Sequence, residues 1–310
     1  MIRYVINRLG QSFLTIFLTV SAVFILVRLA PGDPARTYAG PTATNEQVAE
    51  VRRQFGLDQP LLAQYWTFVK GLFQGDLGTS FSYQAPALEV VLDRLPYTIT
   101  LATSAILVTA LVSVPLGVWM AKRADSRREL WANVLTVAGQ SMPEFWTGFM
   151  LLTLFAVLLP VLPASGFATW GGLVLPTLTI AALQVALIAR MVRREMFNNL
   201  AAPYLTVARS RGVSERVLTW HYAMRNAGVP VLTALGTRFA AMLNGVVVVE
   251  VVFAWPGIGS LVVRALSTRD YPLIVATVLV TAVLAVLVHL LVDLCYPLLD
   301  PRVRLGKAAA

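Results

Sequence analysis

Ionisable side chains inside long apolar runs are the residues of this sequence best placed to meet a ligand. Arg238 lies well inside one such run, and Glu144 lies inside another. An ionisable group at membrane depth usually faces a water-filled cavity or a partner. On a helix, Arg238 shares one face with Ala241 and Gly245, while Asn244 lies on a neighbouring stripe. These five residues are candidates for the wall of a path through a membrane.

The same residues also allow a purely structural interpretation. Arg238 would then pair with Glu144, or with a carboxylate or carbonyl group of a second subunit. Asn244 would hydrogen-bond a neighbouring helix, as amide side chains do between membrane helices. The residue types alone leave both interpretations open.

The sequence predicts no catalytic centre, metal site or cofactor in this chain. The two histidines, His221 and His289, are distant from each other, and Cys295 is the single cysteine, so a zinc site is not predicted. No Gly-x-x-x-x-Gly-Lys-Ser/Thr loop occurs, which excludes an ATP site of that kind.

Composition places the chain in a lipid bilayer. Of its 310 residues, 57% are hydrophobic and 13% are charged, and the mean hydropathy is +0.70. A soluble domain carries about 25% charged residues. The net charge of +9 comes from basic residues at the ends of apolar runs, so we predict no nucleic-acid partner.

The apolar runs predict an all-α membrane protein with six transmembrane helices, since one span needs about 20 residues. The predicted spans are 9–29, 95–121, 131–159, 172–190, 228–253 and 272–298. Basic residues gather in alternate connections, which places both termini in the cytoplasm. The cytoplasmic parts then include 1–8, 191–227 and 299–310, and the extracytoplasmic loops include 30–94 and 254–271.

The long extracytoplasmic loop 30–94 is predicted to fold. Thr44 and Gln47 form a capping-box pattern at the start of one helix. A second helix is predicted from Leu61 to Phe73 and ends before Gly75. The loop either covers the helix bundle or docks an extracytoplasmic partner. The candidate docking residues are Tyr65, Trp66 and Phe81.

The cytoplasmic segment 191–227 is basic and contains its own helical pattern. Arg209 and Arg211 precede Gly212, and the acid Glu215 follows it. The spacing of apolar residues predicts two short helices, with Gly212 ending the first. The residue order is Tyr204, Ala208, Gly212, His221, Arg225-Asn226 and Pro230.

This order resembles the loop that inner-membrane permeases of binding-protein-dependent ABC importers present to their ATPase, in particular the dipeptide, oligopeptide and nickel branch. The family's Glu-Ala-Ala triplet stands here as Thr206-Val207-Ala208, so a role of that carboxylate is not transferred. The resemblance implies the following residues for ATPase coupling: Tyr204, Thr206, Val207, Ala208, Arg209, Arg211 and Gly212.

The resemblance extends along the whole chain. Its further motifs are Pro31-Gly32-Asp33-Pro34, FGLDQPLLAQY at 55–65, GDLGTSF at 75–81, Ser141-Met142-Pro143, EVVFAWPGIG at 250–259 and LDPRVR at 299–304. It implies a homologous second permease, two cytoplasmic ATPase subunits that bind ATP and Mg, and an extracytoplasmic substrate-binding protein. The implied substrates are dipeptides or short oligopeptides, with nickel or a nickel chelate as the alternative. A self-contained secondary transporter or channel is a different class and would leave segment 191–227 unexplained.

Overall fold

The computed structural model describes residues 2–29, 33–40, 42–167 and 170–299. Within them every regular element is a helix, apart from one isolated antiparallel bridge between Thr79 and Pro86. The chain divides into two compact units. Unit 1 comprises Met1–Thr98 and Pro256–Val286, and unit 2 comprises Ile99–Trp255 and Leu287–Ala310.

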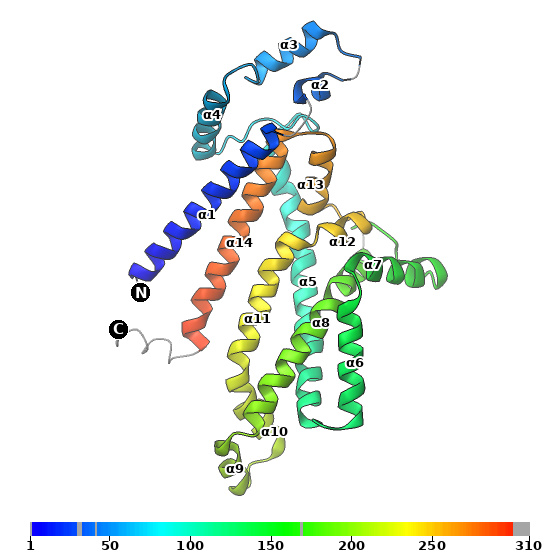
Figure 1. The fold of residues 1–310 in the computed structure, drawn as a ribbon. Coiled ribbons are helices and arrows are strands. Elements are labelled where there is room, and N and C mark those ends of the chain that lie inside the picture. The colour runs from blue at the N-terminus through cyan, green and yellow to red at the C-terminus, as the bar shows by residue number, and fades with distance from the viewer. Residues whose placement is uncertain (1, 30–32, 41, 168–169, 300–310) are drawn as a thin grey trace. The chain divides into compact units, whose positions relative to one another are not determined.

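Unit 1 contains the first helix, the segment that follows it and the helices near residue 270. Its elements are α1 (Ile2–Leu29), α2 (Pro34–Ala39), α3 (Asn45–Gln54), α4 (Leu61–Gln74), the start of α5 (Ala87–Lys122), α13 (Ile258–Ser267) and the start of α14 (Tyr271–Leu299). Figure 1 shows α2, α3 and α4 gathered at the C-terminal end of α1. The segment predicted as a folded loop is therefore a small helical domain.

Local sequence signals set the helix boundaries in this segment. The backbone N–H of Gln47 donates to Thr44 Oγ1 at 3.3 Å, and the Thr44 N–H donates to Gln47 Oε1 at 2.9 Å. The predicted capping box is thus confirmed at the start of α3. The second predicted helix is α4, which ends at Gly75 with φ of +75°, a conformation that favours glycine.

A buried carboxylate attaches the end of this segment to α14. Asp270 is fully buried, and its side chain accepts from Ser80 Oγ at 2.6 Å and from the Ser82 N–H at 2.8 Å. It also accepts from the Leu273 N–H in the first turn of α14 at 3.3 Å. Because each bond goes to a charged acceptor, this group holds residues 80–82 firmly against the helix start.

Unit 2 is a helical bundle with α8 at its centre, where α8 packs against α6, α7 and α11 (Figure 1). Its elements are the rest of α5, α6 (Arg127–Ser141), α7 (Glu144–Leu152), the π-helix η1 (Thr153–Leu158), α8 (Trp170–Leu200), α9 (Pro203–Ser210), α10 (Glu215–Val217), the π-helix η2 (Leu218–Ala223), α11 (Met224–Gly245), α12 (Val247–Val252) and the end of α14. A Cβ on Gly117 of α5 would lie 2.6 Å from the Ala189 carbonyl oxygen, so these two helices touch closely.

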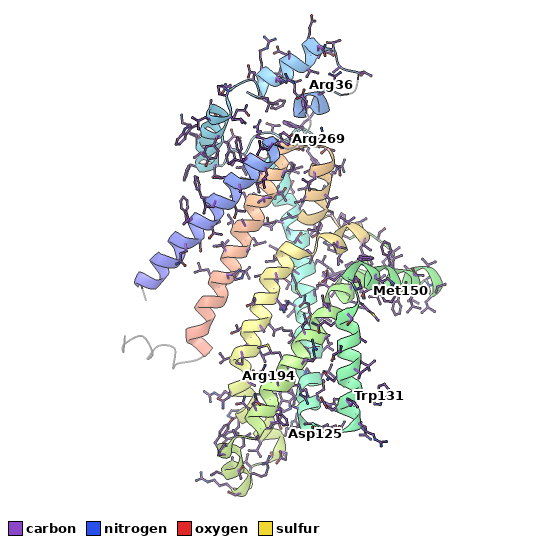
Figure 2. The ribbon with its side chains drawn as sticks, in the orientation of Figure 1. Arg36, Asp125, Trp131, Met150, Arg194 and Arg269 are labelled. Carbon is purple, nitrogen blue, oxygen red and sulfur yellow. The ribbon has the colours of Figure 1, made fainter. Side chains whose placement is uncertain are left out.

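The predicted run 131–159 is not one straight helix. It breaks at Met142 and Pro143, and the helices on either side meet at 100°. The ring of a proline pushes the preceding residue towards extended backbone, and Met142 has φ of −84° and ψ of 127°. Figure 2 shows α7, labelled at Met150, pointing away from α6, labelled at Trp131.

Other predicted boundaries also shift. The α8 helix continues to Leu200 instead of ending at 190, and the run 228–253 is divided at Val246 between α11 and α12. Among the described residues, α5, α8 and Tyr271–Leu291 are each long and apolar enough to cross a membrane. The bent pair of α6 with α7 and η1 is a further span if it crosses as one unit. The count of six spans stays a prediction.

Candidate coupling surface and translocation path

The α9 helix is anchored to the bundle by one buried leucine. Leu205 is fully buried among apolar side chains from the ends of α5, α8 and α11 and from η2. The cluster comprises Val118, Ala121, Ile188, Val192, Met196, Leu205, Leu218, Ala223, Ala227 and Val231. Burying a leucine side chain contributes roughly 1.5–3 kcal/mol, so α9 is held in place chiefly by this contact.

Two polar contacts fix the ends of α9. Asn226 Nδ2 donates to the Tyr204 hydroxyl oxygen at 2.8 Å, and Arg209 Nε donates to Glu215 Oε1 at 2.6 Å. The hydrogen bond from Arg209 lowers the pKa of the Glu215 carboxyl, and the bond to Glu215 raises the pKa of Arg209. The turn between them passes through Gly212 with φ of +81°. The predicted helix end at Gly212 is therefore confirmed.

Most of the predicted coupling residues are exposed on or directly after α9. Ala208 differs, because it is half-buried and packs against the cluster around Leu205. Val207 is the most exposed large apolar side chain of α9, at 53%. The exposed members are Tyr204, Thr206, Val207, Arg209, Arg211 and Gly212. This surface lies at the end of the unit 2 bundle, where α8 ends and α11 approaches (Figure 1). We call these six residues the α9 surface.

The second short helix predicted in this segment is not a separate element. From Glu215 the backbone stays helical through α10 and η2 and continues directly into α11. Gly228 and Pro230 lie inside this helical run without ending it.

The predicted path residues lie on α11 and at the start of α7. Arg238 and Ala241 are both exposed, which agrees with their shared face, whereas the side chains of Asn244 and Gly245 lie outside the described residues. Glu144 is half-buried in the first turn of α7, where the helix dipole favours a carboxylate. Across the described part of unit 2, no ion pair joins Arg238 to Glu144.

Polar contacts between α6 and α8 were not predicted from the sequence. Arg193 Nε lies 2.7 Å from Glu129 Oε1, and the Glu129 carboxylate is nearly buried. Arg190 donates to Gln140 Oε1. The predicted span 172–190 places these arginines at or beyond a span end, because the extension of α8 to Leu200 has no strong local signal. The sequence signal that could have indicated these contacts is Glu129, an acid directly after two arginines.

The predicted docking residues have different surroundings in unit 1. The Tyr65 hydroxyl lies 2.8 Å from Ser21 Oγ of α1, so this side chain faces the interior of the unit. Phe81 packs against the rings of Tyr38 and Phe55. Trp66 is 57% exposed and remains available to a partner.

Family models cover nearly the whole chain. The model described as the inner membrane component of binding-protein-dependent transport systems matches residues 113–305. The model for the N-terminal part of such membrane components matches residues 1–102.

Full-length relatives support the same assignment. A probable peptide ABC transporter permease of Sinorhizobium fredii is 38% identical over 309 residues, covering 97% of this chain and 99% of the relative. A glutathione transport system permease of Salmonella paratyphi A is 37% identical over 304 residues, and that of Escherichia coli strain K12 is 36% identical. Both cover 98% of this chain and 99% of their own length.

Solved structures show the fold. The MetNI methionine ABC transporter aligns with a TM-score of 0.56 and 14% identity, covering 69% of this chain and 98% of that chain. An amino acid ABC transporter crystallised with histidines aligns with a TM-score of 0.51 and 17% identity, covering 67% and 93%. The family matches and the full-length relatives together show that this chain belongs to the multi-pass inner-membrane permeases of binding-protein-dependent ABC importers.

Proposed function

We propose that this permease passes dipeptides or short oligopeptides from an extracytoplasmic binding protein across the cytoplasmic membrane. The observation that carries the proposal is the 36% to 38% identity, over nearly the full length, to relatives named for peptide and glutathione transport. Glutathione is itself a tripeptide, so both names indicate short peptides as the substrate class.

In the proposed importer, the chain crosses the membrane six times with both termini in the cytoplasm. It pairs with a homologous second permease, and two ATPase subunits bind ATP and Mg. Membership of the importer family supports the ATPase and binding-protein partners. The chain itself contributes the membrane path and no catalytic group.

The α9 surface is the proposed contact for an ATPase subunit. It presents Val207 and Arg211 on a helix that Leu205 anchors to three bundle helices. A partner that shifts α9 therefore shifts the ends of α8 and α11 with it. Such rigid attachment is what a coupling element needs in order to convert motion of the ATPase into a change of the path.

The exposed face of α11 is the proposed wall of the path. An unpaired charge inside a bilayer costs ~3 kcal/mol or more by insertion scales, so Arg238 needs water or a partner. A guanidinium can bind a peptide carboxylate through two parallel hydrogen bonds. The proposed path residues are Arg238, Ala241, Asn244, Gly245 and Glu144.

The exposed side of α4 is the proposed contact for the binding protein. Trp66, Leu62 and Phe73 are 57%, 69% and 69% exposed, which is a large apolar area for one short helix. Tyr65 attaches α4 to α1 through its contact with Ser21, and Phe81 packs on the Tyr38 and Phe55 rings.

Reconstitution with the partner subunits tests the proposed substrate. Proteoliposomes would contain the two permeases and the ATPases, with the cognate binding protein added outside. We expect ATP-dependent uptake of labelled dipeptides and of glutathione that unlabelled short peptides inhibit. ATP-dependent uptake of Ni²⁺ or a nickel chelate, with no uptake of any peptide, would replace the proposal by the nickel alternative.

A further inference from the structure

Unit 1 contains a cavity of about 570 Å³ next to the C-terminal end of α1. Its wall is formed by the ends of α1 and α3, by α4, by residues 76–81 and by the start of α14. Pockets that hold small ligands have volumes of about 300–1,000 Å³, so this cavity is large enough for one polar head group. None of the motifs discussed above assigns a role to it.

One arginine in the wall of this cavity is held by aromatic rings. The Arg28 guanidinium lies over the Phe24 ring at 5.1 Å from its centroid and 5.9 Å from the centroid of Tyr271. Within the described part of the chain no carboxylate forms an ion pair with Arg28. Aromatic rings engage the face of a guanidinium and leave its N–H edge available for an oxyanion.

Two other charged groups line the wall. Arg53 lies 3.3 Å from a carboxylate oxygen of Glu50, and Asp76 Oδ1 accepts from the Gly78 N–H at 2.9 Å. Arg28 is thus the cation of the wall whose N–H groups are left for an anionic ligand.

The cavity wall is held open by hydrogen bonds. Gln64 Nε2 donates to the carbonyl oxygens of Leu57 at 3.3 Å and Gln59 at 2.7 Å, which fixes the connection between α3 and α4. A Cβ on Gly71 would clash with the carbonyl oxygen of Asp76, so the segment after α4 folds back closely against that helix. The site is thus formed before any ligand arrives.

The position of Arg28 along α1 indicates the source of the anion. It follows the apolar stretch Gly10–Leu26, within which Leu18 and Leu26 are 57% and 64% exposed. A cation and a tyrosine at the end of an apolar membrane helix are typical of the head-group region of a bilayer. The oxyanion that is abundant at that depth is the phosphate of a phospholipid.

We propose that this cavity binds the head group of an anionic phospholipid, with Arg28 contacting the phosphate and the acyl chains lying against the exposed apolar side chains of α1. Basic pockets beside membrane helices bind anionic lipid head groups in this way. The bound lipid would join α1, α4 and the start of α14, and so stabilise unit 1.

The test uses the assembled importer in detergent, with defined lipids added back. Thermal unfolding would be measured with phosphatidylglycerol, with phosphatidylcholine and with inorganic phosphate, and retained lipid would be counted by native mass spectrometry. We expect phosphatidylglycerol to stabilise the wild type more than phosphatidylcholine does. Arg28→Gln should bind phosphatidylglycerol about tenfold more weakly, because it loses a charge-assisted contact. Phosphatidylglycerol should then raise its unfolding temperature no more than phosphatidylcholine does.

Matched variants separate binding from folding. Lys70→Gln removes an exposed charge of α4 that lies outside the cavity wall, so it should keep the full response to phosphatidylglycerol. Thr67→Trp leaves Arg28 in place and fills the cavity, so it should lose the retained lipid even if Arg28→Gln fails to assemble. An unchanged lipid response in Thr67→Trp or in an assembled Arg28→Gln complex would overturn the proposal. Equal stabilisation by inorganic phosphate would also overturn it, by making the ligand a free anion.

Discussion

At the scale of single residues, two carboxylates hold surface segments in place by different means. Asp270 is fully buried and satisfies three donors, whereas Glu215 is exposed and satisfies one arginine across a turn. Hydrogen bonds to a buried charge are worth more than those of an exposed pair, because water competes with the exposed pair. The two sites therefore respond differently to mutation.

Asp270→Ala is expected to destabilise unit 1. The change leaves Ser80 Oγ and the N–H groups of Ser82 and Leu273 without their acceptor, at a cost of roughly 2–4 kcal/mol. Thermal unfolding of the purified permease should show a lower midpoint. Ser267→Ala is the control, because that exposed hydroxyl bonds within its own helix, to the Val263 carbonyl. Equal midpoints for Asp270→Ala and the control would contradict the role of Asp270.

The Arg209–Glu215 contact is expected to weaken in acid. Arg209 lowers the pKa of Glu215 below its ordinary value of 4.5. The contact therefore stabilises the turn above that pH and is lost as the pH falls through the lower folded-state value. Hydrogen exchange of α9 should be slower in the wild type than in Glu215→Gln at pH 7, and the difference should shrink as the pH falls below 4.5 and vanish once Glu215 is protonated. A difference that is constant from pH 7 to pH 3 would rule out this ion pair.

At the scale of elements, the contact between α5 and α8 and the exposed side of α9 need different kinds of side chain. The first needs a small residue, because backbone atoms of the two helices approach each other at Gly117. The exposed side of α9 needs side chains that can contact a partner, and changes there should leave the fold intact. Substitutions at the two places should therefore separate stability from transport.

Gly117→Ala is expected to destabilise unit 2 by about 1–3 kcal/mol, the usual cost of overpacking. The added methyl group would meet the Ala189 carbonyl oxygen at 2.6 Å and the Val192 side chain. Gly139→Ala in α6 is the matched control, because a Cβ there meets nothing within 4 Å. This control should be neutral or stabilising, since alanine favours helix over glycine. Thermal unfolding of both variants gives the comparison, and equal effects would refute close packing at Gly117.

Val207→Asp is expected to uncouple transport from ATP hydrolysis while leaving the fold intact. Val207 is 53% exposed on α9, so the change affects the partner contact and not the buried cluster. Uptake in proteoliposomes should fall at least tenfold at an unchanged unfolding temperature. Thr206→Ser on the same surface should keep normal uptake. Normal uptake by Val207→Asp would remove the α9 surface from the coupling mechanism.

At the scale of the whole molecule, one face of α11 that carries a charged side chain is exposed in the single chain. Arg238 and Ala241 are exposed there, and the described residues of unit 2 provide no acid partner for Arg238. In the importer that we propose, this face meets either the solute path or the second permease. The two alternatives differ in what the loss of the charge does to assembly.

Arg238→Ala is expected to assemble normally and to lose transport, because the charge contacts the solute. A cysteine at Ala241 should react with a small polar thiol reagent, and its rate should depend on the nucleotide state of the ATPases. Thr237→Ala, on the adjacent exposed position, should keep transport. A lower yield of assembled complex for Arg238→Ala, together with an unreactive Ala241→Cys in every nucleotide state, would show that this face is a subunit contact.

Local patterns in the sequence were enough to predict the membrane class, several helix boundaries and the family. The capping box at Thr44, the end of α4 at Gly75 and the turn at Gly212 each depend on residues within one or two helical turns, so they could be predicted. The apolar runs and the order of motifs were equally informative, because hydropathy and spacing are properties of the chain itself.

Only the tertiary structure decided which side chains are available for function. Ser80 and Asp270 are 190 residues apart, and no local pattern joins them. Tyr65 and Trp66 are adjacent aromatic residues, yet one bonds to Ser21 and the other is exposed. The 100° break at Met142 follows from a proline whose sequence effect is known, but its angle depends on the packing of α7 against α8 and α12. Long-range contacts compete with local preference, and their balance is settled only when the helices pack.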